Sequence, residues 1–339
     1  MQRTADLLAY PAAKDRIDLA EGDHPVFWVT IDTEEDFDWG APFARTGYRL
    51  DSVPALADCQ RYFERAGVCP IYLVDWPIVA DDRALAILGP AQAAGHCDIG
   101  AQLHPWVTPP HDEEVNERNS YTGNLPLALQ RAKMTALRDA IRDRFGTAPT
   151  VYRAGRYGLG GETATMLAEL GFRCDTSVRS AFDYRAGQGP DYRKAPLHPW
   201  RLETPAGPLV EVPVTTVFAG LLGRAGPALY RGAARVGRRA GAGLARLGLV
   251  ERIALTPEGI PADRACRAID VAIARRLPIL TFSFHSPSLQ PGNTPYVRTD
   301  RDLANFYRWW DVVLAHLDRR GVRPAGTDRK STRLNSSHL

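Results

Sequence analysis

The chain has 339 residues, 45% of them hydrophobic, and a formal net charge of +3. This length suits one large domain or two small ones, and so small a charge does not indicate a nucleic-acid-binding protein. Five scattered cysteines without a C-x-x-C pair argue against a disulfide framework and a cysteine zinc site. No signal-peptide core and no window approaching about 20 apolar residues occurs, so we expect a cytoplasmic protein without a membrane span.

Strand-like and helix-like patterns alternate along most of the chain. Apolar runs predict buried strands over 26–31, 69–74, 97–103, 150–153, 172–175, 209–214 and 279–284. Helical periodicity predicts helices over 51–66, 81–94, 127–145, 161–170 and 303–317. This alternation predicts a parallel sheet, in a β/α barrel or an open sheet, with the functional residues at the strand ends. No G-x-G-x-x-G or P-loop pattern occurs, so nucleotide binding has little support.

An acidic cluster follows the first predicted strand directly. Asp32 and Glu34 share one face of an extended chain, so both can point into the mouth of a site. One carboxylate can hold a divalent metal while the other acts as general base on the metal-bound water. The alternative is a solvated acidic loop, but Phe37 and Trp39 within the run favour a wall of the site.

His104 ends the third predicted strand and precedes a rigid turn that contains Pro105 and Trp106. Neutral imidazole is a common ligand for zinc and similar metals, so we expect His104 to be a metal ligand. The alternative is a hydrogen-bonded core histidine. His96 and His111 are weaker candidates for the same shell.

Later strand ends supply further candidate catalytic residues. Arg153 and Arg156 flank a glycine, and either can pair with the general base, contact an anionic sugar or form a structural ion pair. His285 suits a general acid that protonates the leaving group. Asp175 can orient that histidine by accepting its other N–H.

Three segments lie outside the regular alternation. Residues 219–250 hold six arginines and no acid, which is typical of a basic amphipathic helical insertion on anionic lipid or over an acidic substrate. The alternative is a lid with solvated arginines. Residues 1–23 are assigned as an N-terminal extension. Residues 321–339 are expected to be a disordered, partly non-native tail, because their last stretch resembles a translated adapter sequence.

Five segments in this order resemble the polysaccharide deacetylase superfamily with the NodB-homology domain, and look closest to its WalW-like branch. They are 30–39, 99–106, 152–158, 175–177 and 284–287. The resemblance covers most of residues 24–320. It implies a distorted (β/α) barrel of the polysaccharide deacetylase type, in an enzyme that removes N- or O-linked acyl groups from sugars through a divalent metal.

The resemblance also implies a role for each candidate residue: Asp32 as general base, Glu34 and His104 as metal ligands, Arg153 or Arg156 as the tether of the base, and His285 as general acid. Three features depart from the family pattern. Gln102, or a shifted position, replaces the first histidine of the usual metal motif, and Trp106, or nothing, takes the place of the second. The second acid moves from Thr33 to Glu34. A rearranged ligand set, weak metal binding and no metal are therefore the alternatives.

The sequence predicts a hydrolase that uses metal-activated water, with zinc or a similar metal, to remove an acyl group from a sugar or surface-polysaccharide precursor. The expected partner is an acylated carbohydrate rather than nucleic acid, with possible peripheral membrane contact through 219–250. Trp39, Trp106 and Tyr157 are the expected substrate-binding residues, unless these rings belong to the core. The alternatives are a metal-independent amidohydrolase acting on a cyclic amide and a catalytically silent carbohydrate-binding or membrane-associated factor.

Overall fold

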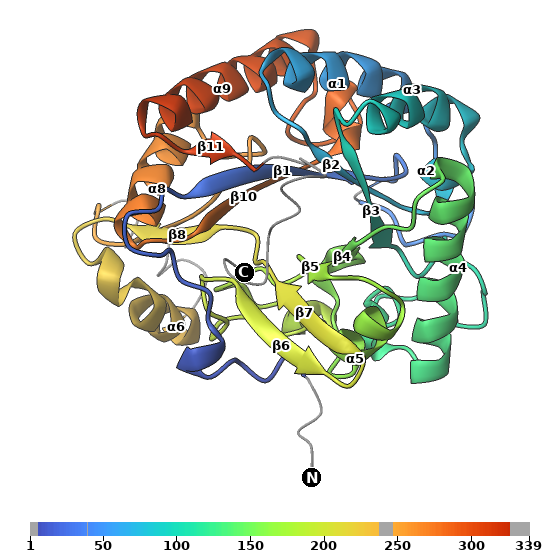
Figure 1. The fold of residues 1–339 in the computed structure, drawn as a ribbon, viewed down its shortest axis with the longest axis horizontal. Coiled ribbons are helices and arrows are strands. Elements are labelled where there is room, and N and C mark those ends of the chain that lie inside the picture. The colour runs from blue at the N-terminus through green and yellow to red at the C-terminus, as the bar shows by residue number, and fades with distance from the viewer. Residues whose placement is uncertain (1–5, 39, 237–246, 326–339) are drawn as a thin grey trace.

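The computed structural model describes residues 6–38, 40–236 and 247–325, and in it helices surround a ring of mainly parallel strands (Figure 1). The main sheet runs in the order β10 (Ile279–His285), β1 (Val26–Thr33), β2 (Ile71–Val74), β3 (Asp98–Leu103), β4 (Val151–Ala154), β5 (Cys174–Asp175), β7 (Gly207–Glu211) and β6 (Trp200–Thr204). Neighbouring strands are parallel except for the β6–β7 hairpin, and β11 (Arg323–Pro324) pairs with β1.

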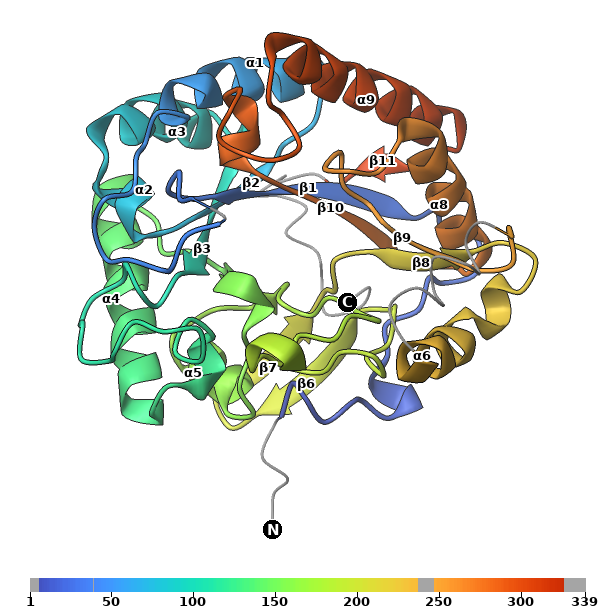
Figure 2. The ribbon, with the colours of Figure 1, turned by 180° about the vertical axis from the view of Figure 1, so that it is seen from behind.

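A second pair of strands, β8 (Thr216–Ala219) and β9 (Glu251–Ala254), is antiparallel and lies beside β10 (Figure 2). The backbone N–H of Ser283 in β10 donates to the Leu255 carbonyl at 3.2 Å, and the Thr215 N–H donates to the Thr281 carbonyl at the same distance. On the other side, the Val212 N–H donates to the Asp175 carbonyl at 2.8 Å. These bonds connect the β5–β7 side with β10, so the predicted distorted β/α barrel is confirmed.

The helices pack on the outside of the strands (Figure 1). They are α1 (Leu56–Arg65), α2 (Trp76–Ala80), α3 (Asp82–Ala93), α4 (Leu127–Phe145), α5 (Thr163–Glu169), α6 (Gly226–Val236), α8 (Ala262–Ala274) and α9 (Asp300–Arg319). The predicted strands and helices match these elements with shifts at their ends. Helix α8 was not predicted, because its buried face consists mostly of alanines and its apolar signal is weak.

The period-two alternation of β1 separates two environments. Phe27, Val29 and Ile31 belong to the large apolar core, whereas Trp28 belongs to a smaller cluster on the other face of the sheet. The large core includes an aromatic group in which Trp310 of α9 lies 5.1 Å from Phe63 and 5.9 Å from Phe284, measured between ring centroids. Asp32 shares the face of Trp28 and stands near the end of the strand, which directs its side chain toward the barrel mouth.

Both ends of the described chain pack on the barrel. Leu7 is buried, and the Ile17 N–H donates to the Pro199 carbonyl at 2.8 Å, so the N-terminal extension covers the start of β6. A disordered tail was expected from residue 321, but the ordered chain continues beyond this point, because Val322 is buried and β11 pairs with β1. Residues 326–339 lie outside the described residues.

The basic 219–250 segment connects β8 to β9. Helix α6 provides its described helical part, with Phe218 and Tyr230 packed at 5.6 Å between ring centroids. Residues 237–246, which contain three of the six arginines, lie outside the described residues. Within the described ranges, no helix is both long and apolar enough to cross a membrane.

Candidate active site

A pocket of about 350 Å³ opens where β1, β3, β4 and β10 end. Eight of the site residues predicted from the sequence line it: Asp32, Glu34, His104, Trp106, Arg153, Arg156, Tyr157 and His285. They meet because parallel strands deliver their carboxyl ends to one face of a barrel. The register places Asp32 of β1 directly beside His285 of β10.

Arg153 holds Asp32. Its Nη1 donates to Asp32 Oδ1 and, at 2.8 Å, to the hydroxyl of Ser283. Its Nη2 donates to the Thr30 hydroxyl at 3.0 Å, and its Nε to the Thr176 carbonyl at the same distance. Both Asp32 and Arg153 are buried, and the paired guanidinium fixes the carboxylate in position.

Arg156 does not take part in that contact. Its Nη2 pairs with Glu117 at 3.2 Å, and its guanidinium lies over the rings of Tyr121 and Phe43, at 4.2 and 4.8 Å from the ring centroids. Of the two arginines that the sequence offered as tether, Arg153 therefore makes the contact with Asp32, and Arg156 lies elsewhere on the pocket wall.

His285 is oriented by Glu258, a residue that sequence reasoning missed. The Nδ1 of His285 lies 2.7 Å from Glu258 Oε2, which leaves Nε2 facing Asp32 Oδ2 at 3.7 Å. Burial alone would lower the pKa of His285, but the carboxylates of Glu258, Glu34 and Asp32 outweigh it and raise the pKa to about 10. Glu258 follows β9. A sequence analysis that predicted this short strand would have identified Glu258 as a carboxylate near a strand end.

The prediction that Asp175 orients His285 is wrong, because Asp175 contacts other residues. Its carboxylate accepts from the hydroxyl of Ser177 at 2.6 Å and from the Ser177 N–H at 3.3 Å. The carboxyl group of Glu211 is also beside it, and burial raises the pKa of both acids. Asp175 does not line the pocket, and its hydrogen bonds with Ser177 hold the start of the loop after β5.

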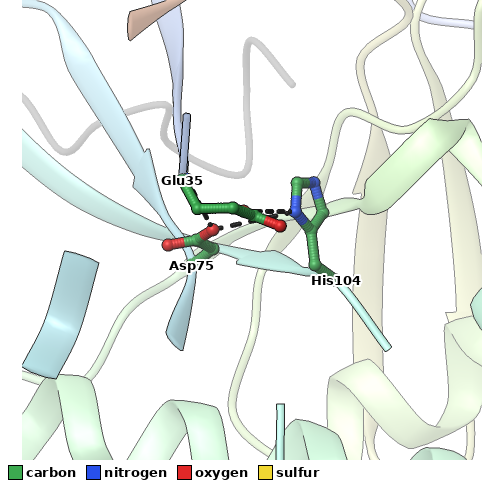
Figure 3. A group of neighbouring side chains, drawn as sticks. All are labelled: Glu35, Asp75 and His104. Carbon is green, nitrogen blue, oxygen red and sulfur yellow. Dashed lines mark hydrogen bonds and ion pairs between the residues drawn. The ribbon is translucent and has the colours of Figure 1, made fainter. Parts of the chain in front are cut away.

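His104 stands between acids on both sides of its ring. Its Nδ1 lies 2.9 Å from Glu35 Oε2 and 3.7 Å from Asp75 Oδ2, whereas its Nε2 lies 3.4 Å from Glu34 Oε2. Figure 3 shows the two carboxylates meeting one ring nitrogen while the other points away from them. Glu35 and Asp75 were not predicted as partners of this histidine.

The protonation of this cluster follows from burial and charge. Burial alone would raise the pKa of Glu35, but His104 and a hydrogen bond from Asp75 lower it to about 2. Burial and the Glu35 charge raise the pKa of Asp75. Glu35 is therefore the ionised acceptor for the Nδ1–H of His104, and Asp75 is the acid of the two that binds a proton more readily.

Two sets of side chains around His104 have donor atoms for a metal. Ligand atoms of Glu35, Asp75 and His104 lie within 4.8 Å of one another. Both acids, however, already accept other hydrogen bonds: Glu35 from the Trp106 indole at 2.8 Å, and Asp75 from the Ile78 N–H at 3.0 Å. This set therefore resembles the outer carboxylates that orient a ligating histidine.

The second set faces the pocket and fits a metal better. Glu34 and Gln102 line the pocket with His104, and the Oε1 atom of each is buried without a hydrogen-bond partner among the described residues. Two buried oxygen acceptors without partners, in a pocket that an imidazole also lines, are donors that suit zinc or a similar divalent ion. Glu34, Gln102 and His104 are thus the residues that would hold the metal.

The predicted substrate-binding residues have different surroundings. Trp106 is buried and lies against the His104 ring, with the centroids 4.4 Å apart and the planes 24° apart. Tyr157 lines the pocket and, like Arg156, has a positive φ, of 60° and 55° respectively. Non-glycine residues in this region are strained, and such strain is frequent at functional sites. Trp39 lies outside the described residues.

The fold is that of polysaccharide deacetylases. A Mycobacterium smegmatis structure assigned as a polysaccharide deacetylase matches with a TM-score of 0.52 and 17% identity, over 95% of each chain. The 4-alpha-glucanotransferase from Thermococcus litoralis matches with a TM-score of 0.52 and 11% identity, over 92% of this chain and 41% of that one. Comparison of the sequence with family models and with curated proteins gives no match. At these identities the likeness establishes the shared fold.

Proposed function

We propose that the protein is a metal-dependent hydrolase that removes an N- or O-acyl group from a carbohydrate. The observation that carries this proposal is the convergence of three units on one pocket: a carboxylate paired with Arg153, a histidine paired with Glu258, and the Glu34, Gln102 and His104 donor set. A base, an acid and a cation site within one enclosure are the parts that acyl hydrolysis requires.

Each residue has a role in this reaction. A divalent metal held by Glu34, Gln102 and His104 would polarise the acyl carbonyl and activate water. Asp32 accepts the proton of the attacking water, and Arg153 holds that carboxylate in position. His285, protonated at neutral pH because of its raised pKa, donates a proton to the leaving amine or alcohol.

The walls of the pocket support a carbohydrate as substrate. Aromatic rings of Phe37, Phe43, Trp106, Tyr121, Tyr157, Tyr184 and Tyr296 line it. Tyrosine and tryptophan offer an apolar face together with a polar edge, which suits a sugar ring. A surface-polysaccharide precursor as substrate, a cytoplasmic location and membrane contact through 219–250 remain predictions.

The first test is the metal content of the purified protein by elemental mass spectrometry. We expect about one zinc or similar ion per chain, lost in His104→Ala and retained in the control His111→Ala, since His111 lies on a loop outside the pocket. The same preparations are assayed for acetate release from acetylated sugars.

A protein that takes up no metal, even after reloading, would contradict the metal mechanism. Gln102 in place of a histidine specifically favours the metal-free amidohydrolase as the second candidate. The variant Gln102→His separates the two, because tighter metal binding with faster turnover supports the metal enzyme, whereas unchanged turnover in metal-free protein supports the other.

A further inference from the structure

Arg179 is a cation on the pocket wall without a carboxylate partner among the described residues. It lies in the loop after β5 and lines the same pocket as Asp32 and His285. Its Nη1 has one long contact, 3.4 Å to the Tyr184 hydroxyl, and its buried Nε has no hydrogen-bond partner in the described parts of the chain. Guanidinium N–H groups that lack acceptors in a confined space are costly to leave unpaired.

The other arginines and His285 on this wall are each matched by an acid. Arg153 pairs with Asp32, Arg156 pairs with Glu117 at 3.2 Å, and His285 pairs with Glu258 at 2.7 Å. Arg179 therefore carries the positive charge of the pocket that no described carboxylate neutralises.

Aromatic stacking holds Arg179 in place. Its guanidinium lies 4.1 Å from the ring centroid of Phe182 and 5.3 Å from that of Tyr157. Arg252 lies 3.6 Å from the centroid of the same Phe182 ring, donates to the Ala181 carbonyl and likewise has no carboxylate partner in the described residues. Arg252 does not line the pocket itself, but it adds a second positive charge at the ring that holds Arg179. The stacking fixes the position of Arg179 without consuming its N–H groups.

We propose that Arg179 binds an anionic group of the substrate, so that the protein acts on an acylated sugar that also carries a carboxylate or a phosphate. Guanidinium groups bind both anions through paired N–H donors, and the pocket enclosure strengthens that attraction. That the substrate carries an acyl group rests on the proposed function, whereas the anion subsite does not.

Binding of sugars that cannot be turned over tests the subsite independently of catalysis. Isothermal titration of the intact protein would compare D-glucose, D-glucuronate and D-glucose 6-phosphate, which separates carboxylate from phosphate recognition. We expect at least one anionic sugar to bind about tenfold more tightly than glucose, with the preference weakening as salt is added. Arg179→Gln should remove the preference and Arg179→Lys should keep part of it. The control Arg201→Gln, at a surface pair with Glu203, should keep all of it.

Three outcomes would overturn the subsite. They are equal binding of neutral and anionic sugars, a preference that survives in Arg179→Gln, and no detectable binding of any of the three sugars at about 10 mM. Circular dichroism shows whether Arg179→Gln folds. If it does not, a reduced anion preference in Arg179→Lys and a salt-sensitive preference in the wild type would support the subsite, and their absence would overturn it. An anion preference without acyl hydrolysis on any substrate would contradict the proposed function alone.

Discussion

Two histidines at the barrel mouth are each bound at Nδ1 by a carboxylate: His104 by Glu35 and His285 by Glu258. This contact directs the other ring nitrogen of each histidine toward the pocket acids Glu34 and Asp32. Burial alone would lower the pKa of each ring, but the neighbouring carboxylates raise it. A protonated ring suits a general acid at His285, whereas a metal bound at His104 would take the place of its Nε2 proton.

Removing the Glu258 charge should lower the pKa of His285. In the wild type this pKa is about 10, so we expect His285 to be protonated at pH 8, and we expect Glu258→Gln to shift the pKa toward the ordinary value of 6.5. Nitrogen-15 NMR of the imidazole across pH measures this directly. In an active preparation the alkaline limb of the rate profile should move to lower pH. The control Glu203→Gln should leave both unchanged, and an unaltered His285 pKa in Glu258→Gln would refute the assigned contact.

Trp106 is expected to act on the metal site through Glu35. The variant Trp106→Phe keeps an aromatic ring beside His104 but removes the indole N–H that donates to Glu35 at 2.8 Å. We expect metal affinity to fall roughly 10-fold or more, as for other changes in outer-shell hydrogen bonds. Competition with a chelator measures the affinity. Trp309→Phe is the matched control, because the Trp309 indole donates to the Ile260 carbonyl away from the site. Unchanged affinity in Trp106→Phe would show that this hydrogen bond has no effect on the metal.

The elements position these residues through close approaches between strand ends. β3 and β4 are parallel neighbours, with Leu103 opposite Ala154. Gly155, directly after β4, has no side chain at a point where a Cβ atom would lie 2.4 Å from His104 Cδ2 and 2.6 Å from the Leu103 carbonyl oxygen. The absence of a side chain at this position is therefore what allows the His104 ring to occupy its place.

Gly155→Ala should displace His104. We expect a loss of roughly 1–3 kcal/mol in the free energy of unfolding and weaker metal binding, because backbone on one side and a ring on the other cannot both move away. Urea denaturation and metal analysis measure the two effects. Gly89→Ala in α3 is the control, since its added Cβ meets only a side-chain atom at 3.4 Å, and it should stabilise by about 0.5–1 kcal/mol. Full metal content in Gly155→Ala would show that His104 tolerates the added methyl group.

At the scale of the whole molecule, stability and site are coupled through buried charges near the barrel mouth. The His285–Glu258 pair joins the end of β10 to the segment after β9, and the Ser288 hydroxyl donates to the same carboxylate at 2.6 Å. Breaking a buried pair by removing one charge leaves the other unpaired, which destabilises a fold more than the loss of a surface pair does.

This pair predicts a pH window for stability. The pKa of His285 is raised from 6.5 to about 10, so its contribution is complete below pH 6.5 and is lost as pH rises through 10. The pKa of Glu258 lies below its ordinary value of 4.5, so its contribution is complete above pH 4.5 and is lost on acidification.

The free energy of unfolding of the wild type should therefore exceed that of Glu258→Gln by the largest amount between pH 4.5 and 6.5. We expect a difference of about 3 kcal/mol there, shrinking toward pH 10. Denaturant titrations at several pH values measure it, with Glu203→Gln as a surface control that should stay within about 0.5 kcal/mol of the wild type. A difference that does not change with pH would show that the pair is not an ion pair.

Local patterns in the sequence determined the parallel β/α architecture and the strand ends that carry Asp32, Glu34, His104, Arg153 and His285. Buried strands are apolar runs and helices have a 3.6-residue period, so both can be read without tertiary information. The shared edge of parallel strands then predicted that polar residues following them would meet. The sequence did not predict β6, β8 and β9, because these strands are short. It also did not predict α8, because the buried face of this helix is rich in alanine.

Only the tertiary structure decided which residues pair. It selected Arg153 over Arg156 for Asp32 and replaced Asp175 by Glu258 as the partner of His285. It also showed that Arg179, unremarkable in the sequence, faces the pocket without a described acid beside it. Such pairings depend on distances between segments far apart in the chain, and burial sets the energy of each charge. Neither distance nor burial is encoded in the spacing of residues along one strand.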